Sequence, residues 1–435
     1  MSPRSLTSPP RLAIFATRFP PLSSSESIVA GRTVSLFARL GIQCTVYLPA
    51  NGGNAVSRDY AHRQCGVADA RPWAVFAHRI AETWRLRTPI ALSSAYVADA
   101  LSAFIQDHAR HPFDAIMTRS NDYYPHVVGV RARTLTDLPW IACVNDPFPP
   151  SLRPEAYSRA QTGIRNRRDM LWERLARTVY ELADAIVFPC ERLRKVTCAR
   201  FPLSHRNGGG RFHVIEHIGG GRPSLEAVKS ARDGNWHLMH IGLLDSARSP
   251  ASLLRPWERF ARRPRVGSPV LSFVGGVHPR HLPILQAAID SVPGSVKLRP
   301  GVSPHESLEC MQEADVLVLI EASMDEGIYL PLKFCDYATS RKPVLALSPR
   351  IGTVSDYLEA FGCGTVVDPT DAGGAYAALC RMHDRWKHGE LRSSKGLADC
   401  FSAGTIAEKW RTLFHELGLD LGQRGHGERT CHSVF

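Results

Sequence analysis

Short apolar runs alternate with segments of helical periodicity along most of this sequence, and that alternation constrains the fold more than any other feature. The runs have the length of buried strands, and the segments between them carry apolar residues at helical spacing. Strands that alternate with helices form βα units, in which the strands pair in parallel and helices cover the sheet. The sequence therefore predicts an α/β protein.

The expected strands fall into two sets, on either side of a linker rich in glycine and proline at residues 219–223. The first set is expected at 12–16, 44–48, 115–118, 141–144, 185–188 and 212–215. The second set is expected at 238–241, 270–274, 296–298, 316–320, 344–347 and 365–367. We therefore expect two doubly wound, Rossmann-like domains facing a cleft. Along the chain we expect an N-terminal domain at 1–221, a C-terminal domain at 222–405, a helix at 406–418 that crosses back, and a disordered tail at 419–435.

The composition excludes several classes of protein. Apolar residues make up 44% of the chain and charged residues 22%, which is typical of a soluble globular protein with sizeable cores. No apolar run approaches the ~18 residues that span a bilayer, and the N-terminal apolar segment is too short for a signal peptide. The eleven cysteines include no Cys-x-x-Cys pair, so we expect reduced thiols and no metal site. A cytoplasmic protein is expected.

The net charge of +12 arises from 53 basic residues against 41 acidic ones. Only eight of the basic residues are lysines, and arginine, alanine, glycine and proline are all frequent, which indicates a compositional bias of the source genome. A basic stretch at 151–211 suits an anionic ligand or a membrane surface. A nucleic-acid partner is not expected, because no aromatic platform or recognisable binding module accompanies this charge.

One segment of the second half carries charges in a pattern suited to a nucleotide. Residues 331–347 place Lys333 and Asp336 one helical turn apart, just before a buried strand. A lysine there can contact phosphate oxygens, and a carboxylate can bind ribose hydroxyls. The alternative is an ordinary surface ion pair, because oppositely charged residues at this spacing are common on helices.

Neighbouring motifs favour the nucleotide interpretation. One expected strand ends at Gly242 and is followed by Arg248, and the strand at 316–320 leads into an acidic loop that contains Glu326. The helical segment then contains Pro331, Lys333, Asp336, Tyr337 and the run Lys342-Pro343-Val344. This order resembles the nucleotide-sugar half of the GT-B-fold retaining glycosyltransferases known as family 4 or group 1.

The resemblance implies roles for individual residues. The residues that would hold the donor diphosphate are Gly242, Arg248 and Lys333. Asp336 would bind the ribose of the nucleotide. The sequence departs from the family pattern at Leu243, which replaces an arginine, and at Ile328, where the family has an acid. Either a longer loop lets Glu326 reach the donor sugar as a catalytic residue, or this contact is absent.

The first half resembles the same family more faintly. After the first expected strand, Ser24 and Ser25 replace the glycines of a loop that contacts the donor diphosphate, and serine can still donate hydrogen bonds there. Asp146 follows a central strand, and it either faces the cleft as a catalytic residue or caps the next segment. His217 precedes the expected hinge, and it is either catalytic or a packed structural residue.

The resemblance implies retaining transfer of a sugar from a nucleoside-diphosphate donor to a glycan, lipid-linked or small-molecule acceptor. Such a reaction passes through an oxocarbenium-like state as the diphosphate leaves, and arginine and lysine can stabilise that leaving group without a metal. We expect no metal and no cofactor, the nucleotide sugar being a co-substrate. The alternatives are a GT-B-fold sugar-nucleotide epimerase and a catalytically degenerate module that binds a nucleotide sugar or a partner.

One segment of the first half has the features of a membrane-surface helix. Within residues 71–87, arginines surround bulky apolar side chains that repeat at helical spacing, namely Trp73, Phe76, Ile80 and Trp84. Such a helix would bring the protein to the inner face of the membrane and to a lipid-linked acceptor. The alternative is a helix that packs its aromatic stripe on its own domain.

Overall fold

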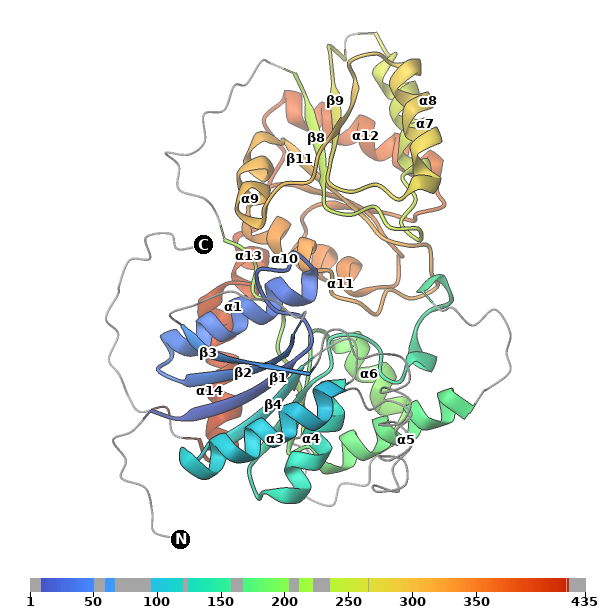
Figure 1. The fold of residues 1–435 in the computed structure, drawn as a ribbon. Helices are drawn as coiled ribbons and strands as arrows, with labels where there is room; N and C mark the ends of the chain where they lie inside the picture. The colour runs from blue at the N-terminus through green and yellow to red at the C-terminus, as the bar shows by residue number, and fades with distance from the viewer. Residues whose placement is uncertain are drawn as a thin grey trace. The chain divides into compact units, whose positions relative to one another are not determined.

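The computed structural model describes residues 9–50, 59–66, 95–119, 124–157, 167–202, 211–221, 235–264, 266–419 and 421. The chain forms two compact units. Unit 1 comprises Met1–Arg153, Ala160–Ile215 and Ile406–Phe435, and unit 2 comprises Pro154–Arg159 and Glu216–Thr405. Each unit contains a parallel sheet with accompanying helices, so the predicted α/β class with two Rossmann-like sheets is confirmed (Figure 1).

The sheet of unit 1 has seven strands in the order β3-β2-β1-β4-β5-β6-β7, and all neighbours pair in parallel. The strands are β1 (Arg11–Ala16), β2 (Gln43–Pro49), β3 (Tyr60–Cys65), β4 (Ala115–Arg119), β5 (Trp140–Cys143), β6 (Ala185–Phe188) and β7 (Phe212–Val214). The helices are α1 (Ser25–Arg39), α3 (Ala95–Arg110), α4 (Tyr124–Leu135), α5 (Arg167–Leu182) and α6 (Glu191–Arg200). The central strands β4, β5 and β6 are buried along their whole length, so the core lies on both faces of the sheet.

The sheet of unit 2 has six strands in the order β10-β9-β8-β11-β12-β13, again all parallel. The strands are β8 (His237–Ile241), β9 (Val270–Val274), β10 (Val296–Arg299), β11 (Val316–Ile320), β12 (Val344–Leu347) and β13 (Thr365–Val367). The helices are α7 (Ala251–Ala261), α8 (Leu282–Ser291), α9 (Pro304–Glu313), α10 (Leu332–Thr339), α11 (Thr353–Ala360), α12 (Ala372–Lys387) and α13 (Lys395–Cys400). Its core gathers aliphatic strand residues around Trp236, Trp257 and Phe260.

The last helix, α14 (Ala403–Glu416), packs on unit 1. The rings of Trp410 and Phe414 lie 5.0 and 5.2 Å from the ring of Phe37 on α1. All three side chains are buried, so α14 supplies part of the apolar core of unit 1 although it follows unit 2 in the sequence.

The order of the strands fixes where a ligand would bind in unit 2. The chain builds β8, β9 and β10 outward in one direction, then returns to place β11, β12 and β13 on the other side of β8. In open α/β sheets, ligands bind outside the carboxyl ends of the strands at such a switch point. A ligand site is therefore expected at the loops that follow β8 and β11.

The sequence locates most of these elements but overlooks one strand. The expected bounds of β9, β11, β12 and β13 are those observed. No strand is expected between β2 and β4, yet β3 lies there at the edge of the sheet. Because β3 is largely polar and only one of its six residues is buried, it lacks the apolar run that signals a buried strand.

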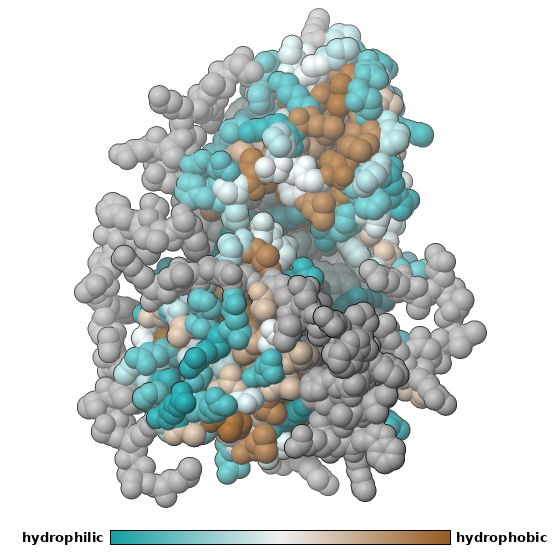
Figure 2. Space-filling view, viewed as in Figure 1, coloured by the Kyte–Doolittle hydropathy of each residue, from teal (hydrophilic) through white to brown (hydrophobic). Residues whose placement is uncertain are grey.

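None of the described helices combines the length and the apolar character needed to cross a bilayer. The segment at 71–87, and nearly all of the tail expected at 419–435, lie outside the described residues. Polar side chains and apolar patches share the visible face (Figure 2). Large exposed apolar side chains in unit 2 include Leu243, Leu282 and Leu298, and scattered residues of this kind are normal on a protein surface.

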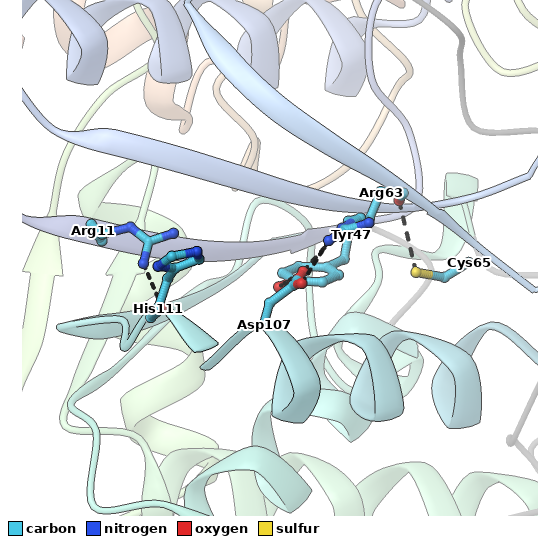
Figure 3. Close-up of polar contacts among 6 residues, drawn as sticks. All are labelled: Arg11, Tyr47, Arg63, Cys65, Asp107 and His111. Atoms are coloured by element: carbon cyan, nitrogen blue, oxygen red, sulfur yellow. Dashed lines mark hydrogen bonds and ion pairs between the residues drawn. The ribbon is translucent and has the colours of Figure 1, made fainter. Parts of the chain in front are cut away.

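A carboxylate on α3 holds the edge of the sheet in unit 1. Asp107 accepts two hydrogen bonds from Arg63 of β3, at 3.0 and 2.7 Å, and one from the Tyr47 hydroxyl of β2 at 3.0 Å (Figure 3). The Arg63 side chain is largely exposed, whereas Tyr47 is buried. Asp107 therefore joins the polar edge strand to the interior through Tyr47.

Replacing Asp107 with alanine should lower the free energy of unfolding by about 1–3 kcal/mol, because the buried Tyr47 hydroxyl loses its acceptor. Arg63→Ala is the matched control and should cost less than about 1 kcal/mol, since exposed ion pairs contribute little. Urea unfolding of both variants measures the difference. Equal losses would show that the Tyr47 hydrogen bond contributes nothing to the stability of this edge.

Candidate functional site

Charged side chains meet at the carboxyl edge of the sheet in unit 2. Lys333 lies in the first turn of α10, a helix that begins after Pro331 and has no side-chain cap. Proline cannot accept hydrogen bonds through its ring, so no capping side chain occupies the first N–H groups of α10. Such a helix start favours an anion.

Lys333 contacts a buried histidine of the sheet. Its Nζ lies 3.3 Å from Nε2 of His240 on β8, and the other ring nitrogen, Nδ1, lies 3.0 Å from the carbonyl oxygen of Val318 on β11. Burial and the nearby Arg248 guanidinium lower the pKa of Lys333 to about 7. Burial and Lys333 also lower the pKa of His240 well below its ordinary value. The two central strands therefore position this lysine.

Gly242 gives Lys333 the space that it occupies. Its φ is +121°, a conformation that favours glycine, and a Cβ atom there would lie only 2.8 Å from the lysine Nζ. The loop after β9 packs closely against Gly242, since a Cβ atom on Gly275 would lie 2.5 Å from the Gly242 carbonyl oxygen. Two residues selected from the sequence, Gly242 and Lys333, are thus in direct contact.

Arg248 lies in the loop between β8 and α7 and is 27% exposed. Its Nε lies 3.3 Å from the Tyr157 hydroxyl and 3.6 Å from Asp245 Oδ2. Tyr157 ends the short 3-10 helix η2 (Glu155–Tyr157) and stacks edge-on against Tyr329, with ring centroids 5.3 Å apart. Both contacts use Nε, and the two Nη groups make no hydrogen bond to any residue in the described ranges.

Glu321, directly after β11, was not among the site residues expected from the sequence. It is 5% exposed, and its Oε2 accepts a hydrogen bond of 2.5 Å from the Ser348 hydroxyl at the end of β12. Burial raises the pKa of Glu321, although Arg248 and Lys333 oppose the change. Its position directly after a wholly apolar strand is the sequence feature that could have identified Glu321.

Asp336 is held by the segment that enters unit 2. It is 8% exposed, so it does not form the exposed surface pair with Lys333 that was the alternative from sequence. Its Oδ1 accepts a hydrogen bond of 2.7 Å from the backbone N–H of Gly220. Gly219 also packs closely on this helix, since a Cβ atom there would lie 2.6 Å from the Cys335 carbonyl oxygen.

The loop that carries Glu326 is fixed through its backbone. The N–H of Gly327 donates to the Ile351 carbonyl at 2.9 Å, and the N–H of Thr353 donates to the Gly327 carbonyl at 2.8 Å. Ile328, which stands where the family pattern has an acid, is 4% exposed and belongs to the interior. Glu326 itself is partly exposed. An acid at the family position would therefore be buried here.

The candidates from the first half are divided between the units. Ser24 is the N-cap of α1, where its hydroxyl accepts a hydrogen bond of 3.2 Å from the N–H of Ser27, and Ser25 is an exposed residue of the first turn. Asp146 follows β5 in unit 1 and is partly buried. His217 is partly buried and belongs to unit 2, just before Gly219.

A buried polar network at the carboxyl edge of unit 1 was not expected. Arg119, the last residue of β4, places Nε 3.1 Å from Glu26 Oε1 in the first turn of α1. Asn145, just after β5, donates to the other carboxylate oxygen of Glu26 at 2.8 Å. Because the charges of Arg119 and Glu26 balance each other, this edge differs from the cationic edge of unit 2.

Neither a protein-family profile nor a curated protein matches this sequence. Solved structures do match: sucrose-phosphate synthase from Thermosynechococcus elongatus has a TM-score of 0.67 at 14% identity, covering 94% of this chain and 99% of that chain. HepE from Anabaena, in complex with UDP and glucose, has a TM-score of 0.64 at 14% identity, covering 93% and 99%. WaaG, a glycosyltransferase involved in lipopolysaccharide biosynthesis, has a TM-score of 0.55 at 14% identity, covering 94% and 96%. The chain therefore has the GT-B fold of these glycosyltransferase structures.

Proposed function

We propose that the protein is a glycosyltransferase and that unit 2 binds its nucleoside-diphosphate sugar. The observation that carries this proposal is the presence of Arg248 and Lys333 beside the uncapped start of α10, at the switch point of the sheet. Guanidinium, ammonium and helix N-terminal N–H groups are three established ways of binding phosphate. Their combination suits a diphosphate better than an uncharged ligand.

The similar structures support this donor class. HepE, which shares the fold of this chain, was solved with UDP and glucose. We propose a nucleotide sugar of that type as donor and a glycan, lipid-linked or small-molecule acceptor. Peripheral contact with the inner face of a membrane through residues 71–87 belongs to the same proposal, since the aromatic and basic side chains of that segment suit an interface.

In the proposed reaction, the bond between the anomeric carbon and the diphosphate breaks through an oxocarbenium-like state. Negative charge then grows on the diphosphate, and the Nη groups of Arg248 and the ammonium of Lys333 stabilise it. Both cations are already oriented, Arg248 by Tyr157 and Lys333 by His240, so little reorganisation accompanies the step. The proposal needs no divalent metal, and it includes retention, as in the family 4 enzymes that the sequence resembles.

The remaining roles follow the family resemblance and are part of the proposal. They are ribose binding by Asp336, contact with the donor sugar by Glu326, catalytic contacts by Asp146 and His217, and diphosphate contacts by Ser24, Ser25 and Gly242. The backbone bonds of Gly327 support the role of Glu326, because they hold its loop in one position. The contact between Gly220 and Asp336 supports ribose binding by fixing that carboxylate.

Lys333→Met should abolish donor turnover, a loss of at least about 100-fold, because an apolar chain of similar length cannot stabilise the leaving diphosphate. Thermal unfolding should move little or upward, since the substitution removes an ammonium that lies near a guanidinium. The matched control is Lys297→Met, an exposed lysine of β10, which should leave turnover unchanged. Turnover by the Lys333 variant at the parent rate would contradict the assignment.

A thermal-shift panel of nucleoside diphosphates and nucleotide sugars should identify the donor. A ligand present at ~100 times its Kd stabilises the folded protein by about 2.7 kcal/mol. The Lys333→Met variant should lose this stabilisation, which ties the effect to unit 2. If no nucleotide raised the unfolding temperature of the parent protein, the proposed donor site would be wrong.

Glu326→Gln should lower kcat while leaving affinity for the free nucleoside diphosphate within about twofold, because the proposed contact is made only with the sugar. Asp325→Asn, which alters the exposed neighbouring acid, is the control and should leave both quantities unchanged. Steady-state kinetics and equilibrium titration separate the two effects. An unchanged kcat in the Glu326 variant would show that the loop makes no catalytic contact with the sugar.

A further inference from the structure

Lys333 has an uncharged hydrogen-bond partner. Its Nζ lies 3.3 Å from Nε2 of His240, and His240 Nδ1 lies 3.0 Å from the carbonyl oxygen of Val318. A carbonyl oxygen can only accept, so this contact assigns the ring proton to Nδ1. Burial and Lys333 lower the pKa of His240 well below its ordinary value, so the ring is neutral and Nε2 carries a lone pair. The partner is therefore a neutral imidazole, which accepts an N–H from the lysine but cannot balance a positive charge.

The charged groups around Lys333 do not balance it either. Within the described part of the chain, no carboxylate forms an ion pair with its ammonium. Asp245, in the loop after β8, pairs with Arg248 instead, at 3.6 Å. Glu321, after β11, accepts a hydrogen bond from Ser348, and burial raises the pKa of this acid. Asp245 and Glu321 raise the pKa of Lys333 by less than burial and Arg248 lower it. Arg248 itself adds a second positive charge.

Two phenols belong to the same cluster of side chains. Tyr337, also on α10, accepts a hydrogen bond of 2.9 Å from the N–H of Ile241, and Tyr157 contacts Arg248. Burial raises the pKa of both phenols, so neither supplies a negative charge near neutral pH. In this setting burial and Arg248 hold the pKa of Lys333 at about 7. The free protein therefore contains both the charged and the neutral form of this lysine near neutrality.

The diphosphate of a nucleotide sugar would supply the missing negative charge. We infer that Lys333 takes up a proton from solvent when a nucleotide sugar binds and returns it when the nucleotide leaves. The proton joins the lone pair of Nζ, and no bond to the ligand forms or breaks. His240 is a positioning residue in this step, because it accepts one N–H and leaves the other two for the phosphate oxygens. The inference rests on the proposed function of unit 2.

The direction of the pH dependence follows from linkage. The bound protein holds more protons than the free protein, so affinity must fall as the pH rises through the pKa of the free lysine. With that pKa at about 7, the Kd for the donor should rise about tenfold between pH 6 and pH 8. A cation with an ordinary lysine pKa would give no such change in this range.

Isothermal titration calorimetry in buffers of different ionisation enthalpy measures the protons exchanged on binding. The probe is UDP-glucose, or the nucleotide sugar that the thermal-shift panel selects, because its phosphates are diesters that do not titrate in this range, unlike a terminal phosphate. The expected uptake per ligand is about 0.9 proton at pH 8 and about 0.1 proton at pH 6.

Three variants assign the proton to its site. Lys333→Arg keeps a positive charge that cannot be lost, so the binding that remains should proceed without proton uptake. Glu321→Gln removes a neighbouring carboxyl group that could titrate, and uptake should persist. His240→Leu removes the acceptor, so affinity should fall and its pH dependence should move to lower pH. A purely structural role of His240 would weaken binding equally at every pH.

The outcomes separate this inference from the proposed function. Binding of the nucleotide sugar with no proton uptake at pH 8 would overturn the inference and leave the donor site intact. Uptake that persists in Lys333→Arg, or disappears in Glu321→Gln, would assign the proton elsewhere and overturn it too. Failure of the parent protein to bind any nucleotide sugar at either pH would overturn the proposed function and this inference together.

Discussion

Repulsion between two like charges, Lys333 and Arg248, is the interaction on which the rest of this site depends. Each cation has a neutral partner that uses only one of its donor groups. The ring of His240 contacts the ammonium of Lys333, and the hydroxyl of Tyr157 contacts Nε of Arg248. Because Gly242 has no side chain, the ammonium of Lys333 can occupy the space beside it. The site thus keeps a positive centre with incomplete internal compensation, and in the function proposed here an anionic ligand provides the rest.

The same topology carries different electrostatics in unit 1. There, too, the strand order changes direction, between β1 and β4, and a basic residue stands at the carboxyl edge. Arg119, however, is matched by Glu26, and Asn145 completes the network from the next strand. Arg248 of unit 2 also has a carboxylate nearby, Asp245, but that contact uses Nε and lies at 3.6 Å, and no carboxylate in the described residues pairs with Lys333. This contrast supports the proposal that unit 2 supplies the main cationic contacts to the donor.

Local patterns account for how much of this arrangement the sequence reveals. Apolar runs predict the buried strands, the one-turn spacing of Lys333 and Asp336 points to that lysine, and the family resemblance adds Arg248. The sequence does not predict roles for His240 and Glu321, because their hydrogen-bond partners are distant in sequence. The Val318 carbonyl lies 78 residues from His240, and Ser348 lies 27 residues from Glu321. The edge strand β3 escapes for another reason, since its exposed surface removes the apolar pattern on which strand prediction depends.

The path of the backbone means that no single cut in the chain separates the two units. The chain passes between the units at four places, after residues 153, 159, 215 and 405. A single cut near residue 215 would separate Arg248 from Tyr157, and it would leave Phe37 without the aromatic rings of α14. Joining the first half of this chain to the second half of a related chain would therefore pair Tyr157 and Phe37 with partners from another protein. Exchanging one unit for that of a related chain therefore requires junctions at all four of these places.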